Sequence, residues 1–451
     1  MAELNSFHLK TYPNQDYLLH PIKAEGHYIF DKNGKKYIDL TAGGTSFNLL
    51  GSGNNKVHQG IINQMNKFEH LDCKTFDDDN REILSDILIN TSNVFTSSPK
   101  KVFFSGGSGS EGIEMAMHLS YQFHKESGNN KKKWFISRDQ SYHGATSGAL
   151  SLGERPNLEF YRPLQSQFRK RVSECNYVRK KQKNESEQKY TQRLVKEFED
   201  TISEIGSENI CAFVSETMMG GLVGDVPPTK DYWKIIKKIC EKNNIHLILD
   251  EVWCGTGSSG KYHCFEYDGI VPDFLVLGKT LGCGYIPISC VIVPAEFEEI
   301  IKNGTQRIEM SCTFQAHSLA IASAIEVQKI ISQDTFIENV FKKGEYIRKV
   351  LKDNLKDQNF IKDIRGRGIR NTVEYQCEDI NDFCSQISYE LFENYNILIS
   401  SKWHRTSFSH AMNLSWKEID FYLDAYLETL VSIYKKRKKN KNLIKQKRAY
   451  F

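Results

Sequence analysis

The stretch from Leu247 to Lys279 reads LILDEVWCGTGSSGKYHCFEYDGIVPDFLVLGK. It contains two short apolar runs, LIL and FLVL, of the kind that form buried strands. The first run stops at Asp250-Glu251, and the second stops just before Gly278-Lys279. Because the carboxyl ends of parallel strands share one edge of an open sheet, where ligands bind, we expect Asp250 and Lys279 to face the same site.

A carboxylate and an amine on one sheet edge suit the chemistry of pyridoxal 5'-phosphate (PLP). The amine of Lys279 can form a Schiff base with the cofactor's aldehyde, and once released it can move a proton between the substrate α-carbon and the cofactor. The carboxylate of Asp250 can hold the pyridine nitrogen protonated, because a charge pair about 4 Å apart is worth on the order of 4 kcal/mol at an effective dielectric near 20. Lys279 and Asp250 are therefore the predicted catalytic residues.

A phosphate site is predicted in VFFSGGSGSEGIEMAMHL, residues 102–119. Ser108 and Glu111 have the spacing of a capping box, which predicts that a helix begins there. Gly109 and Ser110 would then offer backbone N–H groups and a hydroxyl at the helix N-terminus, where the dipole stabilises an anion by about 0.3–1 kcal/mol. We expect Ser108, Gly109 and Ser110 to bind the cofactor phosphate.

These motifs resemble the signature of the class-III, or ω-type, PLP-dependent aminotransferase family. That signature runs apolar-Asp-Glu-Val, Gly-x-Gly, x-x-Gly-Lys, then Pro-Asp-apolar-Gly-Lys, and the only departure here is Ser258, which stands where an arginine is usual after Gly-x-Gly. The similarity covers about residues 20–430. It implies an α/β structure with the PLP-dependent transferase fold (aspartate-aminotransferase-like, fold type I), in which a mainly parallel seven-stranded sheet is joined to a smaller α+β domain.

The resemblance implies further cofactor contacts beyond the phosphate site. Tyr142 and His143, in SYHGATSG, match the family's Tyr-His-Gly, so that Tyr142 would stack on the pyridine ring and Val252 would pack on its other face. Glu216 matches a glutamate at a strand end, although Thr217 replaces the proline that follows it in the family. A second acid that several relatives carry nearby is absent, because Gly221 stands there.

The resemblance also implies a homodimer with shared active sites. Thr313, in SCTFQAHSLA, matches a threonine whose hydroxyl reaches the phosphate of the neighbouring subunit's cofactor. Arg365 and Arg367, in RGRG, match an element that opens the small domain, and we expect them to be structural. No metal site is predicted.

The predicted substrate contacts are Thr45, Trp253 and Arg405. Trp253 stands where glutamine or a small apolar residue is commoner in the family, which would narrow the pocket. Many relatives read apolar-Arg-apolar-Ser-Pro-Pro-Leu where this chain reads TSFSHAMNLSW, so the carboxylate-binding arginine is missing there. Arg405 lies two residues upstream of that place and could serve instead.

The predicted function is that of a PLP-dependent aminotransferase, which moves an amino group between an amine or amino acid and a keto acid or aldehyde by a ping-pong mechanism through a lysine aldimine. An aminomutase, racemase or decarboxylase on the same fold would use the same residues, so that alternative stays open. A dinucleotide-dependent oxidoreductase is disfavoured, because the glycine loop follows a long N-terminal region and no ribose-binding acid stands at the next strand end. A non-catalytic binding module is disfavoured by the presence of Asp250 and Lys279 together.

Charge and cysteine content narrow the partners and the compartment. Nine Lys or Arg residues fall in 435–451, and removing them from the formal net charge of +4 leaves −5 on the rest of the 451-residue chain, which does not favour a nucleic-acid groove. No apolar run approaches the roughly 18 residues of a membrane span. The 11 cysteines form no Cys-x-x-Cys pair, and MAELNSFHLK lacks a hydrophobic signal segment, so a cytoplasmic location is predicted.

The order of the patterns predicts the domains. HYIFDKNGKKYIDL, residues 27–40, predicts a hairpin, and strand-like runs then alternate with helical ones to about residue 300, as in a parallel α/β domain. A helix over 318–331 and a strand over 365–375 follow. The predicted parts are an N-terminal segment 1–56 that packs with the small domain, a large PLP-binding domain 57–314, a small C-terminal domain 315–434 and a flexible basic tail 435–451.

Overall fold

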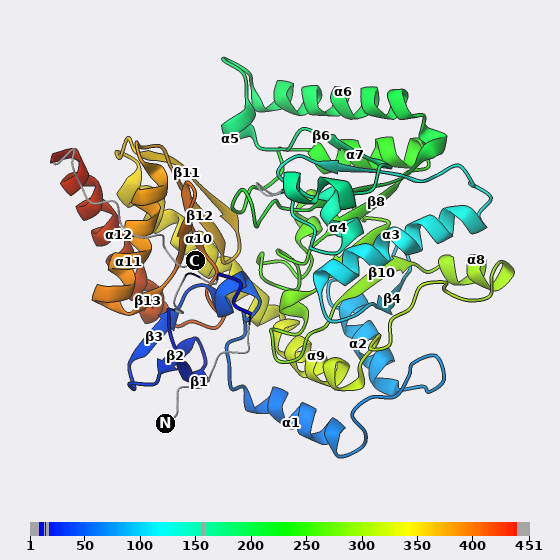
Figure 1. Ribbon diagram of the computed structural model, residues 1–451, viewed down its shortest axis with the longest axis horizontal. Coiled ribbons are helices and arrows are strands. Elements are labelled where there is room, and N and C mark those ends of the chain that lie inside the picture. Colours follow the sequence, from blue (N-terminus) through cyan, green and yellow to red (C-terminus); the bar gives the residue numbers. More distant parts are fainter. Residues whose placement is uncertain (1–8, 13, 15–17, 155–157, 440–451) are drawn as a thin grey trace.

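The computed structural model describes residues 9–12, 14, 18–154 and 158–439. Its centre is a seven-stranded sheet in the spatial order β4-β10-β9-β8-β7-β5-β6 (Figure 1). The strands are β4 (Lys100–Phe104), β5 (Trp134–Arg138), β6 (Arg169–Val172), β7 (Ile210–Glu216), β8 (His246–Asp250), β9 (Phe274–Leu277) and β10 (Cys290–Pro294). Pairing is parallel from β9 through β6, whereas β10 runs antiparallel to β4 and β9. The predicted mainly parallel sheet is thus confirmed.

Helices cover both faces of the central sheet, which explains why its strands are apolar on both sides. Side chains alternate along β8, so that Leu247 and Leu249 belong to the apolar cluster of α7 (Tyr232–Lys242), while Ile248 belongs to that of α3 (Gly109–Glu126). The other helices of this region are α1 (Asn55–Met65), α2 (Asp79–Asn90), α4 (Ser147–Leu152), α5 (Tyr177–Lys180), α6 (Glu187–Ile205), α8 (Phe297–Asn303) and α9 (Ser318–Ile331).

Two four-stranded sheets lie beside the central one, and one of them joins distant parts of the chain. Its order is β1-β2-β3-β13, where β13 (Ile397–Leu398) pairs in parallel with β3 (Lys36–Asp39). The predicted hairpin is confirmed by the antiparallel pairing of β3 with β2 (Tyr28–Asp31), which follows β1 (Pro21–Glu25). At the turn, the Asp31 carboxylate accepts the N–H groups of Asn33 and Lys35, each at 2.9 Å.

The third sheet has the order β11-β12-β15-β14 and lies against the helices that end the chain. A single strand was expected over 365–375, but the chain reverses there because Gly368, with φ of 54°, allows a tight turn. The elements of this part are β11 (Ile361–Arg367), β12 (Arg370–Tyr375), β14 (Ser400–Lys402), β15 (Arg405–Phe408), α10 (Asp334–Leu355), α11 (Ile380–Tyr395) and α12 (Trp416–Lys439).

The domain boundaries remain a proposal. The buried side chains of α9 share one apolar cluster with those of α1 and α2, so we propose that the small domain begins after Ile331. Helix α12 continues through Lys439, into the segment predicted as a basic tail, whereas 440–451 and 1–8 lie outside the described residues. Among the described helices, none combines the length and the apolar character needed to cross a membrane.

Gln328 on α9 is predicted to hold the turn that follows β9. Its buried amide donates to the carbonyls of Thr280 and Leu281, and its oxygen accepts the hydroxyl of Tyr262. Gln328→Leu should lower the free energy of unfolding by about 2–4 kcal/mol, because three buried polar groups lose their partner. Urea denaturation would measure this, and the exposed Gln333→Leu serves as the control, with an expected change within about 0.5 kcal/mol. Equal losses in both variants would contradict the assignment.

Candidate active site

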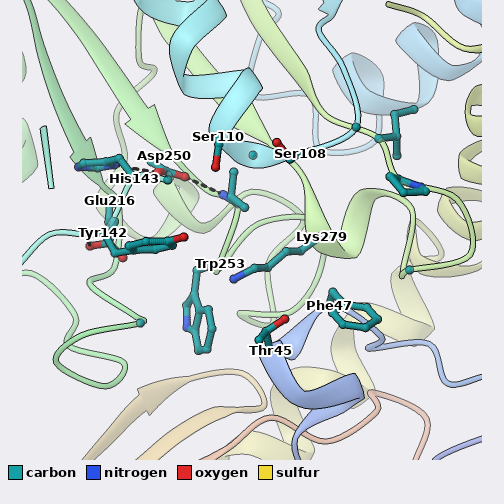
Figure 2. A pocket seen from close by; sticks show the side chains of 18 of the residues that line it. Thr45, Phe47, Ser108, Ser110, Tyr142, His143, Glu216, Asp250, Trp253 and Lys279 are labelled. Carbon is teal, nitrogen blue, oxygen red and sulfur yellow. Dashed lines mark hydrogen bonds and ion pairs between the residues drawn. The ribbon is translucent and has the colours of Figure 1, made fainter. Parts of the chain in front are cut away.

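A cavity of about 430 Å³ opens at the carboxyl edge of the central sheet (Figure 2). Most of the predicted site residues line it, although they come from separate parts of the chain. Those that line it are Thr45, Ser108, Gly109, Ser110, Tyr142, His143, Glu216, Asp250, Val252, Trp253 and Lys279. Arg405 and Thr313 do not line it.

The parallel pairing of β8 with β9 brings the two predicted catalytic groups to one edge. Asp250 pairs with Val276, three residues before Lys279. Lys279 begins a single 3-10 turn and has a φ of 44°, a left-handed conformation that is strained for a residue with a side chain. Such strain is concentrated at functional sites, where the surrounding structure enforces it.

The amine of Lys279 is less basic than an ordinary lysine. Burial, together with the positive charge of Arg370, lowers its pKa to about 8, while the nearby carboxyl groups of Asp250 and Glu216 act in the opposite direction. The Nζ atom also lies 4.5 Å from the centre of the Trp253 ring. A large fraction of this amine is therefore neutral at mildly alkaline pH and can act as a nucleophile or base.

Asp250 is held by two donors. Its Oδ2 atom lies 2.8 Å from Nδ1 of His143, and its Oδ1 accepts the N–H of Val252 at 3.0 Å (Figure 2). Both side chains are buried, and no described residue is bonded to Nε2 of His143. The carboxylate is thus fixed in orientation at the cavity wall.

The N-terminus of α3 forms another part of the wall. The predicted capping box is confirmed: Ser108 Oγ accepts the N–H of Glu111, and the Glu111 carboxylate accepts the N–H of Ser108 at 2.9 Å. A side chain at Gly109 would approach Val252 to 2.7 Å, so glycine keeps this end of the cavity open. The positive end of the helix dipole therefore faces the cavity.

Glu216 organises the loop that carries Tyr142. One of its carboxylate oxygens accepts the N–H of Tyr142 at 3.3 Å, and the other accepts the N–H of Gly220 at 3.0 Å. Burial raises the pKa of Glu216, and the neighbouring Asp250 carboxylate acts in the same direction. Figure 2 shows the ring of Tyr142 beside the cavity, near Asp250.

Sequence reasoning missed several residues of the cavity. Phe47 lines it and packs between two glycines, because a Cβ would come within 2.5 Å of its ring at Gly43 and within 2.4 Å at Gly284. The adjacent glycines of TAGGTSF, residues 41–47, favour a tight loop but do not indicate which side chain lines the cavity. The missed lining residues are Phe47, Gly107, Gly144, Gly221, Gly284, Ile286, Pro287 and Ile288.

A buried polar network behind Trp253 was also missed. The ring of Trp253 lies 4.4 Å from the guanidinium carbon of Arg370, and its Nε1 donates to Asp225 at 2.8 Å. Asp225 also accepts the hydroxyl of Thr372. Arg370 and Asp225 are fully buried, yet they stand outside the motifs by which the site was predicted.

Arg405 and Thr313 have other surroundings. The Arg405 guanidinium donates to the carbonyls of Leu222 at 2.8 Å and Gly221 at 2.7 Å, and it reaches the cavity only through the loop that contains Gly221. Thr313 is exposed, and its carbonyl lies 3.2 Å from Nε2 of His70. Arg365 holds the same loop through the carbonyls of Val223 and Gly224, as its expected structural role requires.

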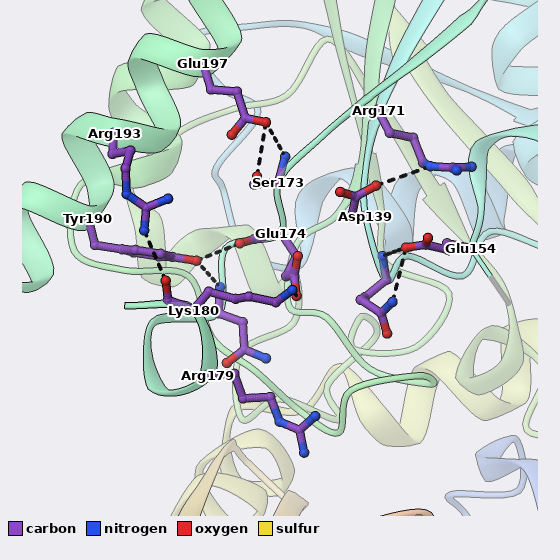
Figure 3. A network of polar contacts seen from close by, with 12 residues as sticks. Asp139, Glu154, Arg171, Ser173, Glu174, Arg179, Lys180, Tyr190, Arg193 and Glu197 are labelled. Carbon is purple, nitrogen blue, oxygen red and sulfur yellow. Dashed lines mark hydrogen bonds and ion pairs between the residues drawn. The ribbon is translucent and has the colours of Figure 1, made fainter. Parts of the chain in front are cut away.

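A second cavity, of about 560 Å³, lies beyond Leu222 and is lined by several arginines. Two of these form ion pairs, Arg171 with Asp139 at 3.3 Å and Arg179 with Glu374 at 2.7 Å. Figure 3 shows Arg171 directed at Asp139 in the polar network that surrounds it. Arg162 also forms an ion pair, with Glu159, and Arg169 bonds to Gln165, so the side chains of these arginines are engaged within the protein and we regard this cavity as structural.

A third cluster combines Glu251, Cys254 and Cys264, whose ligand-type atoms lie within 4.8 Å of one another. Glu251 is already engaged, since its oxygens accept the hydroxyl of Thr217 and the N–H groups of Cys264 and Phe265. A metal ion would have to displace these bonds. The carboxylate therefore braces the turn after β8.

The central sheet, with a lysine and an aspartate on its carboxyl edge, defines the class of PLP-dependent enzymes of fold type I. The profile of the family described as aminotransferase class-III matches residues 11–393. The chain belongs to this family. It is accordingly a PLP-dependent aminotransferase, with PLP as its cofactor.

Relatives agree with this assignment. An aminotransferase of Gibberella zeae is 34% identical over 79% of this chain and 70% of its own length. Gamma aminobutyrate transaminase 2 of Solanum lycopersicum is 31% identical over 78% of this chain and 77% of its own. The crystal structure of the omega transaminase from Pseudomonas jessenii, in complex with PMP, superposes with a TM-score of 0.86 at 27% identity, over 92% of this chain and 93% of that chain.

The cavity fits PLP in its donor set. The N-terminus of α3 would suit an anion, the partly neutral amine of Lys279 an aldehyde, and the buried carboxylate of Asp250 a protonated ring nitrogen. The glycine at 109 leaves room for the cofactor between helix and sheet.

The pH dependence of cofactor uptake tests the basicity of Lys279. We expect the rate at which the apoprotein binds PLP to rise with pH up to about 8 and then level off, because above its pKa the amine is neutral. Borohydride reduction at timed intervals, followed by peptide mapping, would measure the PLP attached to Lys279. A rate that keeps rising to the ordinary lysine value of 10.5, or a label on another lysine, would contradict the prediction.

Proposed function

We propose that the cavity of about 430 Å³ is the active site, and that PLP attaches to Lys279. The observation that carries this proposal is that one cavity brings together the buried amine of Lys279, the carboxylate of Asp250 and the N-terminus of α3, and the lowered pKa of Lys279 supports it. When bound, PLP supplies an aldehyde that takes up the substrate's amino group and a ring that withdraws electrons from its α-carbon. Lys279 Nζ would accept the proton of that carbon and deliver it to the cofactor, which is the proton shift that transamination requires.

Asp250 and His143 act as a unit in this proposal. The Asp250 carboxylate holds a proton on the ring nitrogen of the cofactor, and His143 keeps that carboxylate oriented at 2.8 Å. The N–H groups of Gly109 and Ser110 and the Ser110 hydroxyl bind the phosphate, whereas Ser108, whose N–H and hydroxyl both donate to Glu111, contributes by capping the helix beside it. Glu216 acts indirectly, because its two backbone contacts place Tyr142 for stacking on the ring opposite Val252.

The substrates proposed are an amine or amino acid and a keto acid or aldehyde. Thr45 and Trp253 line the cavity beside Lys279 and would contact the substrate (Figure 2). Arg405 would contribute from behind Gly221, whose carbonyl it binds. All 11 cysteines are free, which supports a reducing, cytoplasmic location, and neither nucleic acid nor membrane is a proposed partner.

We propose further that the protein is a homodimer with shared active sites. Thr313 is exposed, and beside it Phe314 is 66% exposed. His70 joins this segment to the loop after α1, since its ring lies 6.0 Å from that of Phe314. Other exposed apolar side chains of these two segments and of the end of α1 are Ile62, Met65, Leu71, Phe76 and Met310. Exposed apolar side chains on neighbouring segments are typical of surfaces that a second protein covers.

Asp250→Asn should separate cofactor binding from catalysis. Supplied with an amino donor and no acceptor, the wild-type holoenzyme should release one keto acid per site. The variant should retain PLP but release keto acid about 10²–10³-fold more slowly, because the charge that keeps the ring protonated is lost. Stopped-flow absorbance would record both rates.

The matched control for this test is Asp273→Asn. Asp273 binds Lys237 and the N–H of Leu247 near the start of β8, at the opposite edge of the sheet. That variant should keep the wild-type rate. A normal rate in Asp250→Asn would refute the proposed role of the aspartate, whereas a wild-type protein that releases no keto acid from any donor would refute the proposed function.

Phe314→Asp should weaken the proposed dimer. A charge in the centre of an apolar interface is costly, so we expect the dissociation constant to rise by at least about 10-fold, with a parallel loss of PLP retention. Analytical ultracentrifugation and absorbance after dialysis would report the two effects. Phe421→Asp, at an exposed position of α12, should change neither. A wild-type monomer at micromolar concentration would rule out the shared site.

A further inference from the structure

Arg370 is a buried cation with few partners. It begins β12 and is 0% exposed. Its two terminal nitrogens donate to Ser409 Oγ and to the carbonyl of Ser46, both at 3.3 Å, and no described residue accepts from its Nε. A guanidinium offers five N–H donors, so most of this hydrogen-bonding capacity is unused. Burial of a charge with unused N–H donors is costly unless another group accepts hydrogen bonds from them.

The other buried arginines of this region are better satisfied. Arg365 forms ion pairs with Asp363 at 3.0 Å and Glu374 at 2.6 Å. Arg405 donates to two carbonyls at 2.7 and 2.8 Å, shorter than either bond of Arg370, although its Nε, like that of Arg370, has no partner among the described residues. Among the described residues, no carboxylate lies within ion-pair distance of Arg370. Arg370 is thus the member of the group that lacks a strong acceptor.

The charges near Arg370 do not cancel. Asp225 is the acid that acts most on both Arg370 and Arg405, and its oxygens already accept Trp253 Nε1 and the Thr372 hydroxyl. Arg405 is also acted on by the Glu374 carboxylate, whereas Asp225 is the one carboxylate that acts appreciably on Arg370 among the described residues. Burial lowers the pKa of Arg370 to about 10, which still leaves it charged at neutral pH. A further anion placed beside Arg370 would therefore be stabilised by its positive charge.

The unused donors lie directly behind the cavity wall. Trp253 lines the cavity, with Arg370 at 4.4 Å and the amine of Lys279 at 4.5 Å from its ring. The Ser46 carbonyl that Arg370 binds belongs to the segment whose neighbours Thr45 and Phe47 also line the cavity. Figure 2 shows Thr45 and Trp253 on the same side of Lys279. An anion attached to a substrate held at Lys279 is therefore within reach of this corner.

The segment 42–46, which lies between Arg370 and the cavity, has a strained backbone. Within the segment 42–46, Ala42 has a φ of 45° and Ser46 a φ of 60°, although both carry side chains. Residues in this region of conformational space cost about 1–3 kcal/mol each and are common in parts that rearrange on binding. If Arg370 gave up its 3.3 Å hydrogen bond to the Ser46 carbonyl and bound a carboxylate instead, the stronger charged bond would offset the free-energy cost of moving this segment.

We propose that Arg370 binds the carboxylate of an amino-acid or keto-acid substrate, with Trp253 and the segment 42–46 as its movable cover. This inference rests on the proposed function of the cavity and narrows it to substrates that carry a carboxylate. A planar guanidinium can hold both oxygens of a carboxylate, which also orients the amine toward Lys279.

The test compares substrates that differ only in the carboxylate. Holoenzyme is mixed with glycine, L-alanine, β-alanine or 4-aminobutyrate, and in parallel with methylamine, ethylamine or propylamine, the corresponding decarboxylated amines. The absorbance of the cofactor gives the rate of each half-reaction. We expect the wild type to favour at least one amino acid over its amine, and Arg370→Met to reduce that ratio by about 10- to 100-fold, the range of a hydrogen bond to a charged group.

A second measurement does not depend on turnover. Because the charge of Arg370 lowers the pKa of Lys279, the Arg370→Met apoprotein should take up PLP with a midpoint shifted to higher pH. Circular dichroism would establish that this variant is folded, and Arg370→Lys, which retains the charge, should keep the wild-type midpoint while losing part of the substrate preference.

Two further variants, Arg437→Met and Arg405→Met, show whether the effect is specific to Arg370. Arg437→Met removes an ion pair with Asp382 in the small domain, away from the cavity, and should leave the ratio unchanged. Equal losses with amino acids and amines in Arg370→Met, an unshifted midpoint, or loss of the preference in Arg405→Met alone would overturn the assignment of Arg370. Failure of wild-type protein to bind PLP or to react with any donor would instead refute the proposed function itself.

Discussion

The parallel pairing of β8 with β9 is the constraint on which the site depends. It sets Asp250 opposite Val276 and so fixes the aspartate relative to the turn that begins at Lys279. The register is enforced by burial, since Ile248 packs toward α3 while its neighbours Leu247 and Leu249 pack toward α7. A slip of one residue would exchange these faces and turn the carboxylate away from the cavity. The geometry of the reactive groups is therefore a property of the core.

Burial also determines the chemistry of the site. The amine of Lys279 is surrounded by protein and by the charge of Arg370, both of which disfavour its protonated form. Asp250 is held by His143 and Val252 at the same edge. The fold thus keeps the Lys279 amine partly neutral and the Asp250 carboxylate fixed in orientation within the same cavity. Both properties arise from the surroundings of the two side chains.

The sequence predicted the parts of the fold in which local patterns and burial agree. Six apolar strands of the central sheet and the hairpin at Asp31 were predicted because their periodicity and turn residues are unambiguous. β6, with the sequence RKRV, was missed because it lies at the edge of the sheet and three of its residues are basic. The reversal between β11 and β12 was missed because the same glycines also suited a family motif within one strand.

The residues of the candidate site likewise fall into those that local sequence motifs predicted and those that only the tertiary fold reveals. Lys279, Asp250 and the start of α3 belong to motifs with local spacing, and they line the cavity as expected. Phe47, Asp225 and Arg370 come from loops or strands that only the tertiary fold brings near Lys279. Nothing in the sequence around Arg370 distinguishes it from the neighbouring Arg365 and Arg367, which are engaged in other contacts. Its isolation from acids is visible only in three dimensions.

The pairing of β3 with β13 affects the order in which the chain can fold during synthesis. β3 occupies residues 36–39, yet its partner, Ile397–Leu398, is translated after nearly the whole of the remaining chain. By then all seven strands of the central sheet have left the ribosome, so the larger domain can gain most of its core first. Until β13 emerges, β3 presents an open edge, and its length of four residues limits the template it offers to other nascent chains.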